Sequence, residues 1–204
     1  LDNDLTKSEF ALKANKILLV GIHDLLQLLE DQKEDTQHWR KVFMHSIKDT
    51  YWYMSVDYNE SVLGQLINNN GIKLVKDKEI SNAILKYQEG LIIYKNQYSF
   101  LKDYFHEMEE TQKSLFDLRL ARSAFLFIEE DHENMLKPIS DFQEFVQRGD
   151  YVINKDPLVL SSYYGDVLYY ESNLKYFNSL INEQIRLAQD LKILIDTKYE
   201  IRRE

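Results

Sequence analysis

The chain contains no cysteine and, among 204 residues, only six glycines and two prolines. Without cysteine it can form no disulfide, no thiolate-ligated zinc or iron–sulfur site and no thiol nucleophile. Glycine and proline form most tight turns, so their scarcity disfavours a sheet-rich fold, which needs many turns. Few turns imply long elements, and long elements are typical of helices. We therefore predict an all-α fold.

The chain also lacks a net positive charge and long apolar runs. The formal net charge is −9, and a nucleic-acid partner is disfavoured because phosphate binding requires a concentrated basic surface. The most apolar window, ILLVGIHDLLQLL, is interrupted by His23 and Asp24 and falls far short of the roughly 18 apolar residues of a membrane span. Hydrophobic residues make up 44% and charged residues 29%, as in ordinary globular proteins. We expect the chain itself to fold as a soluble protein.

Helical periodicity begins near the N-terminus. The pattern TKSE at Thr6–Glu9 predicts the capping box of a first helix, which runs to the charged stretch Glu30–Asp35. A second helix is predicted from the spacing of Trp39, Val42, Phe43, Ile47 and Met54. A third, short helix follows at residues 62–67. Asn68–Asn70 and Gly71 are expected to end it, with Gly71 in the left-handed conformation that closes many helices.

The clearest helical signal follows Asp77, which is the predicted N-cap of the next helix. Its apolar and aromatic residues step by four and three in a heptad-like seam: Ile80, Ile84, Tyr87, Leu91, Tyr94, Tyr98, Leu101, Phe105 and Met108. The phase then changes, and an unbroken helix to about Asn134 would span roughly 90 Å, too long for one compact domain. A kink or break is therefore predicted near Glu109–Ser114.

The C-terminal third of the chain predicts two further helices. Pro138 and Gly149 bracket a short one, and NKDP starts a long one with Asp156 as N-cap and Pro157 at the first helical position. The long helix carries an apolar stripe: Val167, Tyr170, Leu174, Phe177, Ile181, Ala188, Leu191 and Ile195. This stripe matches the seam in period, so we expect the two helices to pack side by side. Without linkers or repeats, residues 1–204 are predicted to form a single domain, an elongated bundle of long amphipathic helices with short connecting helices.

Sequence patterns typical of catalytic or metal-binding residues are weak in this chain. Glu129 and His132 have the i, i+3 spacing that di-iron helical bundles use together with further carboxylates. Two similar pairs carry the shorter aspartate: Asp35–His38 and Asp103–His106. An ordinary solvated helix face is the favoured interpretation of all three pairs. No serine-nucleophile or phosphate-binding motif occurs, so the sequence assigns no catalytic, cofactor-binding or metal-binding residue and no cofactor. We predict that the protein is not an enzyme.

Some tyrosines and histidines are further candidates for ligand-binding groups. Tyr87, Tyr94 and Tyr98 could form an aromatic cage, but their place on the seam favours a core position with the hydroxyls at the rim. His38 and His45 lie two turns apart on one predicted helix, too far apart to chelate one ion. They are expected to be partly buried polar residues.

The segment LGQLINNNGIKLVKDKEISNAILKY, residues 63–87, resembles a large family of Bacteroidetes proteins, a domain of unknown function. The family pattern is a short helix that ends in a glycine turn, an apolar crossover, and a helix start with a tyrosine two turns on. The matching positions are Gly71, Leu74, Asp77, Lys78, Glu79, Ile80 and Tyr87. These motifs are structural and assign no activity.

The resemblance implies an all-helical domain preceded directly by an N-terminal transmembrane helix. The chain begins LDND without an initiator methionine, as expected where an anchor or signal peptide has been removed. We therefore expect a non-enzymatic envelope module for protein interaction or sensing, tethered to the inner membrane with its domain in the periplasm. Its expected partners are other envelope proteins or a second copy of itself. The alternative is a di-iron-like helical-bundle metal protein or enzyme.

Overall fold

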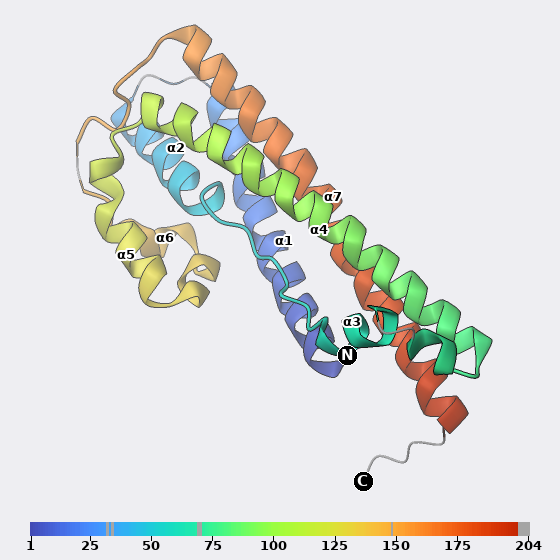
Figure 1. The fold of residues 1–204 in the computed structure, drawn as a ribbon. Helices are drawn as coiled ribbons and strands as arrows, with labels where there is room; N and C mark the ends of the chain where they lie inside the picture. The colour runs from blue at the N-terminus through green and yellow to red at the C-terminus, as the bar shows by residue number, and fades with distance from the viewer. Residues whose placement is uncertain (32, 34, 69–70, 148, 200–204) are drawn as a thin grey trace. The chain divides into compact units, whose positions relative to one another are not determined.

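The computed structural model describes residues 1–31, 33, 35–68, 71–147 and 149–199 (Figure 1). The predicted all-α bundle is confirmed, because helices account for 82% of the described residues and no strand occurs among them. One isolated antiparallel bridge joins Phe116 to Val152. The helices are, in chain order, α1 (Asp2–Asp31), α2 (Thr36–Asp49), α3 (Ser61–Asn68), η1 (Gly71–Leu74), α4 (Lys78–Leu115), η2 (Leu118–Ala121), α5 (Arg122–Glu130), η3 (His132–Leu136), α6 (Ile139–Phe142) and α7 (Pro157–Tyr199), where η marks a short 3-10 helix.

The chain divides into two compact units. Unit 1 combines Leu1–Lys13, Met54–Ser99 and Tyr176–Glu204, and unit 2 combines Ala14–Tyr53 and Phe100–Lys175. The long helices α1, α4 and α7 each contribute residues to both units. Since this division does not decide how many domains the chain forms, the single domain stays a prediction.

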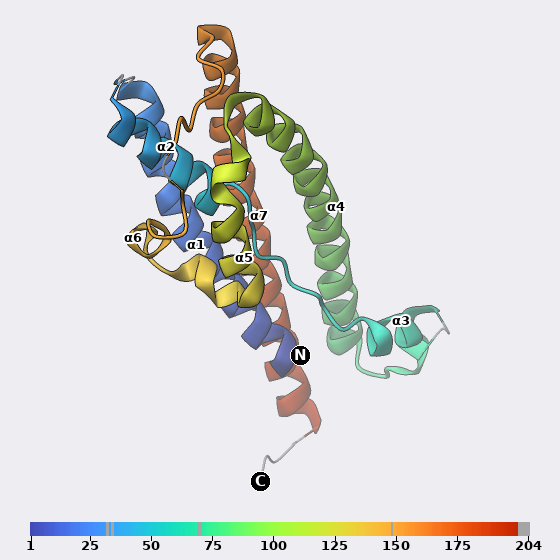
Figure 2. The ribbon, with the colours of Figure 1, turned by 90° about the vertical axis from the view of Figure 1, so that its left-hand side faces the viewer.

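In unit 1 the predicted seam of α4 is buried against α7. The ring of Tyr94 stacks on Phe177, with the ring centroids 5.0 Å apart, and Tyr58 packs edge-on against Tyr94 at 5.1 Å. Tyr87 and Tyr94 are both buried, which confirms that they are core residues, and Tyr98 is half-buried. The Tyr94 hydroxyl does not lie at a rim as expected. It accepts the N–H of Val56 at 2.6 Å, from the extended segment 52–60 that leads into α3 (Figure 2).

In unit 2 the predicted break of the long helix is confirmed, but it falls just after the stretch Glu109–Ser114, which stays helical around the buried Gln112. Gln112 lies within this polar stretch, yet its amide donates to the carbonyl of Ser46 and to the Tyr163 hydroxyl, both at 3.2 Å. The polar sequence is therefore compatible with a continuous helix, and α4 runs on to Leu115.

The break itself falls at residues 116 and 117. There the backbone leaves the helix to bond with a later segment: Asp117 donates its N–H to the Tyr151 carbonyl at 3.0 Å, and Ile153 donates to the Leu115 carbonyl at 2.9 Å. Because these partners are distant in sequence, local spacing could not reveal the position of the break.

Two of the predicted N-caps are confirmed. Asp77 accepts the backbone N–H groups of Ile80 at 3.2 Å and Glu79 at 2.9 Å. The Ile80 bond, together with the Lys198 ammonium 3.1 Å away, holds the pKa of the Asp77 carboxyl below its ordinary value. Asp156 accepts the N–H of Leu158 at 2.9 Å, and α7 begins at Pro157 as predicted. An aspartate before a helix thus proved a sound indicator of its start.

Other predicted boundaries are wrong. Helix α1 begins at Asp2, and Thr6 lies inside it with its hydroxyl donating to the Asp2 carbonyl at 3.2 Å, so TKSE is no capping box. Helix α2 ends at Asp49, before Met54. Of the short helix predicted between Pro138 and Gly149, only the four residues of α6 are helical, and turns follow.

The corner at Gly71 differs from its prediction as well. Helix α3 is confirmed, but Gly71 has no positive φ and instead begins η1, while Asn69 and Asn70 lie outside the described residues. A Cβ atom at Gly71 would stand 3.0 Å from the Leu66 carbonyl oxygen and 3.2 Å from the Leu66 Cα. Glycine is required by close approach of two backbone segments, not by a left-handed conformation.

Gly71→Ala is therefore expected to lower the free energy of unfolding by about 1 kcal/mol, because backbone atoms of α3 must shift to admit the methyl group. The matched control is Gly165→Ala in α7, where an added Cβ meets no atom within 4 Å. That change should stabilise the protein by about 0.5–1 kcal/mol, the usual gain in a helix interior. Urea denaturation measures both, and equal effects would contradict the close-approach explanation.

Candidate functional site

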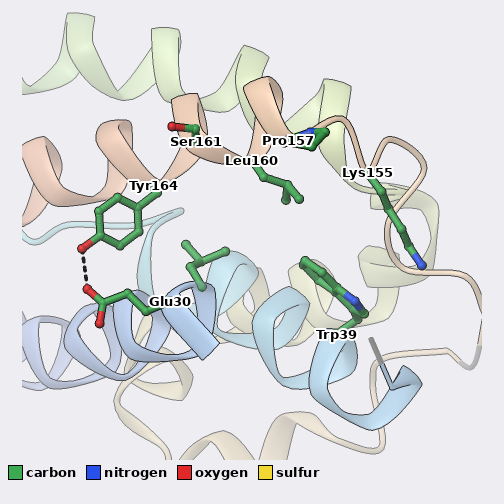
Figure 3. Close-up of a pocket in the computed structure, with 8 residues that line it drawn as sticks. Glu30, Trp39, Lys155, Pro157, Leu160, Ser161 and Tyr164 are labelled. Atoms are coloured by element: carbon green, nitrogen blue, oxygen red, sulfur yellow. Dashed lines mark hydrogen bonds between the residues drawn. The ribbon is translucent and has the colours of Figure 1, made fainter. Parts of the chain in front are cut away.

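A pocket of about 720 Å³ lies in unit 2, where the C-terminal end of α1 and the starts of α2 and α7 come together (Figure 3). Small-ligand sites typically enclose about 300–1,000 Å³, so the pocket has the size of such a site. Its lining residues are Leu29, Glu30, Trp39, Lys155, Pro157, Leu160, Ser161 and Tyr164.

Two capped helix starts hold the walls of the pocket in place. Asp35 is the N-cap of α2 and accepts the backbone N–H of His38 at 2.8 Å, which fixes the first turn that carries Trp39. The Trp39 ring also packs edge-on against the buried His38 ring, with centroids 5.5 Å apart. On the other side, Pro157 pre-sets the first turn of α7, from which Leu160 lines the pocket.

The pocket has an apolar middle and charged ends. Figure 3 shows Glu30 at one end and Lys155 at the other, with Trp39 and Leu160 between them. The Tyr164 hydroxyl donates to Glu30 Oε1 at 2.6 Å, and this bond is the main reason why the pKa of Tyr164 is raised. The ammonium of Lys155 forms no ion pair with any residue that the structure describes.

A smaller hollow of about 260 Å³ shares Trp39 and Lys155 with this pocket. It is further lined by Thr36, Gly149, Asp150, Tyr151 and Val152. Trp39 and Lys155 thus border both hollows, which makes them the central residues of this surface.

The described side chains of the pocket offer groups suited to binding a ligand. A serine nucleophile needs a hydrogen-bonded base, and Ser161 has none among the described residues. The Glu30–Tyr164 bond joins a carboxylate to a phenol whose pKa is raised, which makes the phenol a weaker proton donor. The chemistry offered is apolar contact, one anionic end and one cationic end.

The histidines of the sequence-predicted pairs that the structure describes do not line the pocket. The following contacts show where each of them lies. Asp35 caps α2, so the Asp35–His38 pair has a helix-capping role. His38 and His45 are both buried, more deeply than expected. On α2, His45 Nδ1 lies 2.8 Å from Asp49 Oδ2. His106 lies on the solvent side of α4, 3.6 Å from Glu109.

No three His, Asp or Glu side chains in the described part of the chain come together as metal ligands. Glu129 is exposed at the end of α5, and the side chain of its proposed partner His132 lies outside the part that the structure describes. The di-iron hypothesis therefore gains no support from the described side chains.

None of the pocket residues is predicted as a site residue from the sequence. Trp39 stands out there only as a helix position, and Pro157 only as a helix start. The pocket unites segments far apart in the chain, as the 134-residue separation of Glu30 and Tyr164 illustrates. No local spacing links such segments, so the one available signal was a large aromatic residue in the first turn of a helix.

The resemblance of residues 63–87 to the Bacteroidetes family stays an expectation, because no comparison with known proteins bears on it. No helix in the described ranges has an 18-residue stretch apolar enough to cross a bilayer. No protein-family model matches the chain, and no curated protein or solved structure is significantly similar to it.

Proposed function

We propose that the protein is a non-enzymatic binding module for protein interaction or sensing, and that the Trp39 pocket is its binding site. The observation that carries the proposal is a ligand-sized hollow with an aromatic and aliphatic middle and two oppositely charged ends. Sites of this kind bind through apolar contact and use a few polar groups for orientation. No lining side chain that the structure describes is arranged for nucleophilic or metal-assisted chemistry.

The cellular setting rests on the family resemblance. The proposed module belongs to the cell envelope, tethered to the inner membrane by a helix before Leu1, with its domain in the periplasm and envelope proteins or a second copy as partners. The net charge of −9 supports a partner other than nucleic acid. The gene sequence upstream of Leu1 tests the tether, since a directly preceding apolar segment of about 20 residues supports it and a polar one contradicts it.

Trp39→Ala is the direct test of the pocket. Indole and naphthalene, used as apolar probes, should shift the amide NMR signals of residues around the pocket. The variant should weaken their binding by about tenfold or more, since large aromatic side chains dominate binding energy. Trp39→Phe, which keeps an aromatic ring, should lose less affinity.

Leu126→Ala, at an exposed apolar position on α5 away from the pocket lining, is the control for nonspecific binding. It should leave probe affinity unchanged, and equal loss in both alanine variants would contradict the assignment of the site. Stoichiometric iron or manganese in protein purified without chelator would favour the alternative, a di-iron-like metal protein.

A further inference from the structure

The two charged ends of the pocket restrict what it can hold. The Glu30 carboxylate accepts one hydrogen bond, from Tyr164, and its two oxygens have room for further donors. Lys155 offers three N–H donors and has no ion-pair partner in the described part of the chain. A purely apolar ligand would leave both groups unused, and a ligand with one charge would satisfy only one end.

The start of helix α7 favours an anion at the Lys155 end of the pocket. Lys155 lies just before Pro157, at the start of the 43-residue helix α7, where the helix dipole favours negative charge. The neighbouring carboxylate of Asp156 is engaged as the N-cap through its bond with Leu158. At the far end, Glu30 is the only acidic residue among the described residues of the lining, and it favours a cation.

Resting on the function proposed above, we propose that the pocket binds a short apolar peptide with free ends. Its ammonium group pairs with Glu30, its carboxylate pairs with Lys155, and its side chains pack on Trp39 and Leu160. A free peptide carries the two opposite charges at the two ends of an apolar body, which is the order found in the pocket. The volume of about 720 Å³ suits a ligand of a few residues.

End-capped peptides test this proposal. Leu-Phe-Leu and Ile-Tyr-Val are each used in four forms: free, N-acetylated, C-amidated and capped at both ends. Isothermal titration calorimetry at pH 7 and low salt should show the free form binding tightest. Each cap should weaken binding by about fivefold, and added salt should narrow the differences because it screens exposed charges.

Two variants assign each end of the peptide to its residue. Lys155→Gln should abolish the preference for a free carboxylate and keep the preference for a free amine. Glu30→Gln should do the reverse, while its amide oxygen can still accept the Tyr164 hydroxyl. Both residues are exposed, so unchanged circular dichroism spectra and unfolding midpoints should show that the variants fold.

The outcomes separate the peptide proposal from the proposed binding function of the pocket. Equal binding of all four forms, abolished by Trp39→Ala, would overturn the peptide proposal and leave the pocket as a general apolar binding site. Loss of both preferences in either single variant would overturn the assignment of the ends. Failure of both peptides in every form to bind, while indole and naphthalene still bind, would overturn the peptide class alone. Failure of peptides and apolar probes together would overturn the proposed function as well.

Discussion

Replacing Tyr94 with alanine is expected to lower the free energy of unfolding by about 3–5 kcal/mol, the usual loss for a buried aromatic side chain. Only 2% of Tyr94 is exposed, and its ring packs between Phe177 and Tyr58. The same change removes the hydroxyl that accepts the Val56 N–H, and a buried donor without a partner adds to the loss. Urea or thermal denaturation followed by circular dichroism measures the effect.

Two further variants separate the ring from the hydroxyl and from general effects. Tyr94→Phe keeps the ring and removes the hydroxyl, so it should lose about 1–3 kcal/mol. Tyr176→Ala removes a tyrosine that is 51% exposed on α7 and should change stability by less than about 0.5 kcal/mol. A Tyr94→Ala protein as stable as the Tyr176→Ala protein would show that the seam is not core, and the aromatic-cage hypothesis would become the better one.

The buried face of α4 and the N-caps of α4 and α7 could be predicted because they depend on residues close together in the sequence. The spacing of Ile80, Leu91 and Tyr94 places them on one helix face, and burial of that face follows from its apolar character. Asp77 and Asp156 bond to backbone groups two or three residues away, so their role is visible in a window of four residues.

Features formed by distant segments were not predictable. The break after Leu115 depends on bonds to Tyr151 and Ile153, which lie far from it in the sequence. The pocket depends in the same way on segments that meet only in the folded chain. Spacing rules describe one helix at a time, whereas these features arise where elements meet.

The buried charges of α2 were missed for another reason. Asp49 lies at the end of a helix with polar residues on several sides, as a solvated helix end would. In the structure only 1% of Asp49 is exposed, and only 4% of Lys48. Asp49 Oδ1 accepts from Lys48 Nζ, and Asp49 Oδ2 lies near His45 Nδ1, both at 2.8 Å. Pairing allows these groups to be buried, and composition alone cannot show which charges are paired.

Asp49→Ala is expected to destabilise the protein by about 3–5 kcal/mol, because it leaves the buried ammonium of Lys48 without its partner. The exposed pair Glu183–Arg186 on α7 is the control. Glu183→Ala should lose less than about 1 kcal/mol, since exposed ion pairs contribute little. Chemical denaturation measures the stability of both variants. Similar small losses of stability would mean that water reaches the cluster of His45, Lys48 and Asp49 on α2.

Gly21 offers an independent test of the same cluster. A Cβ atom at Gly21 would overlap the side-chain carboxylate of Asp49, so Gly21→Ala must displace a carboxylate that two hydrogen bonds hold. The single variant should therefore be strongly destabilised. In Gly21→Ala/Asp49→Ala the obstructing carboxylate is gone, so the combined loss should be smaller than the sum of the two single losses. Additive losses would show that Asp49 does not occupy the space beside Gly21.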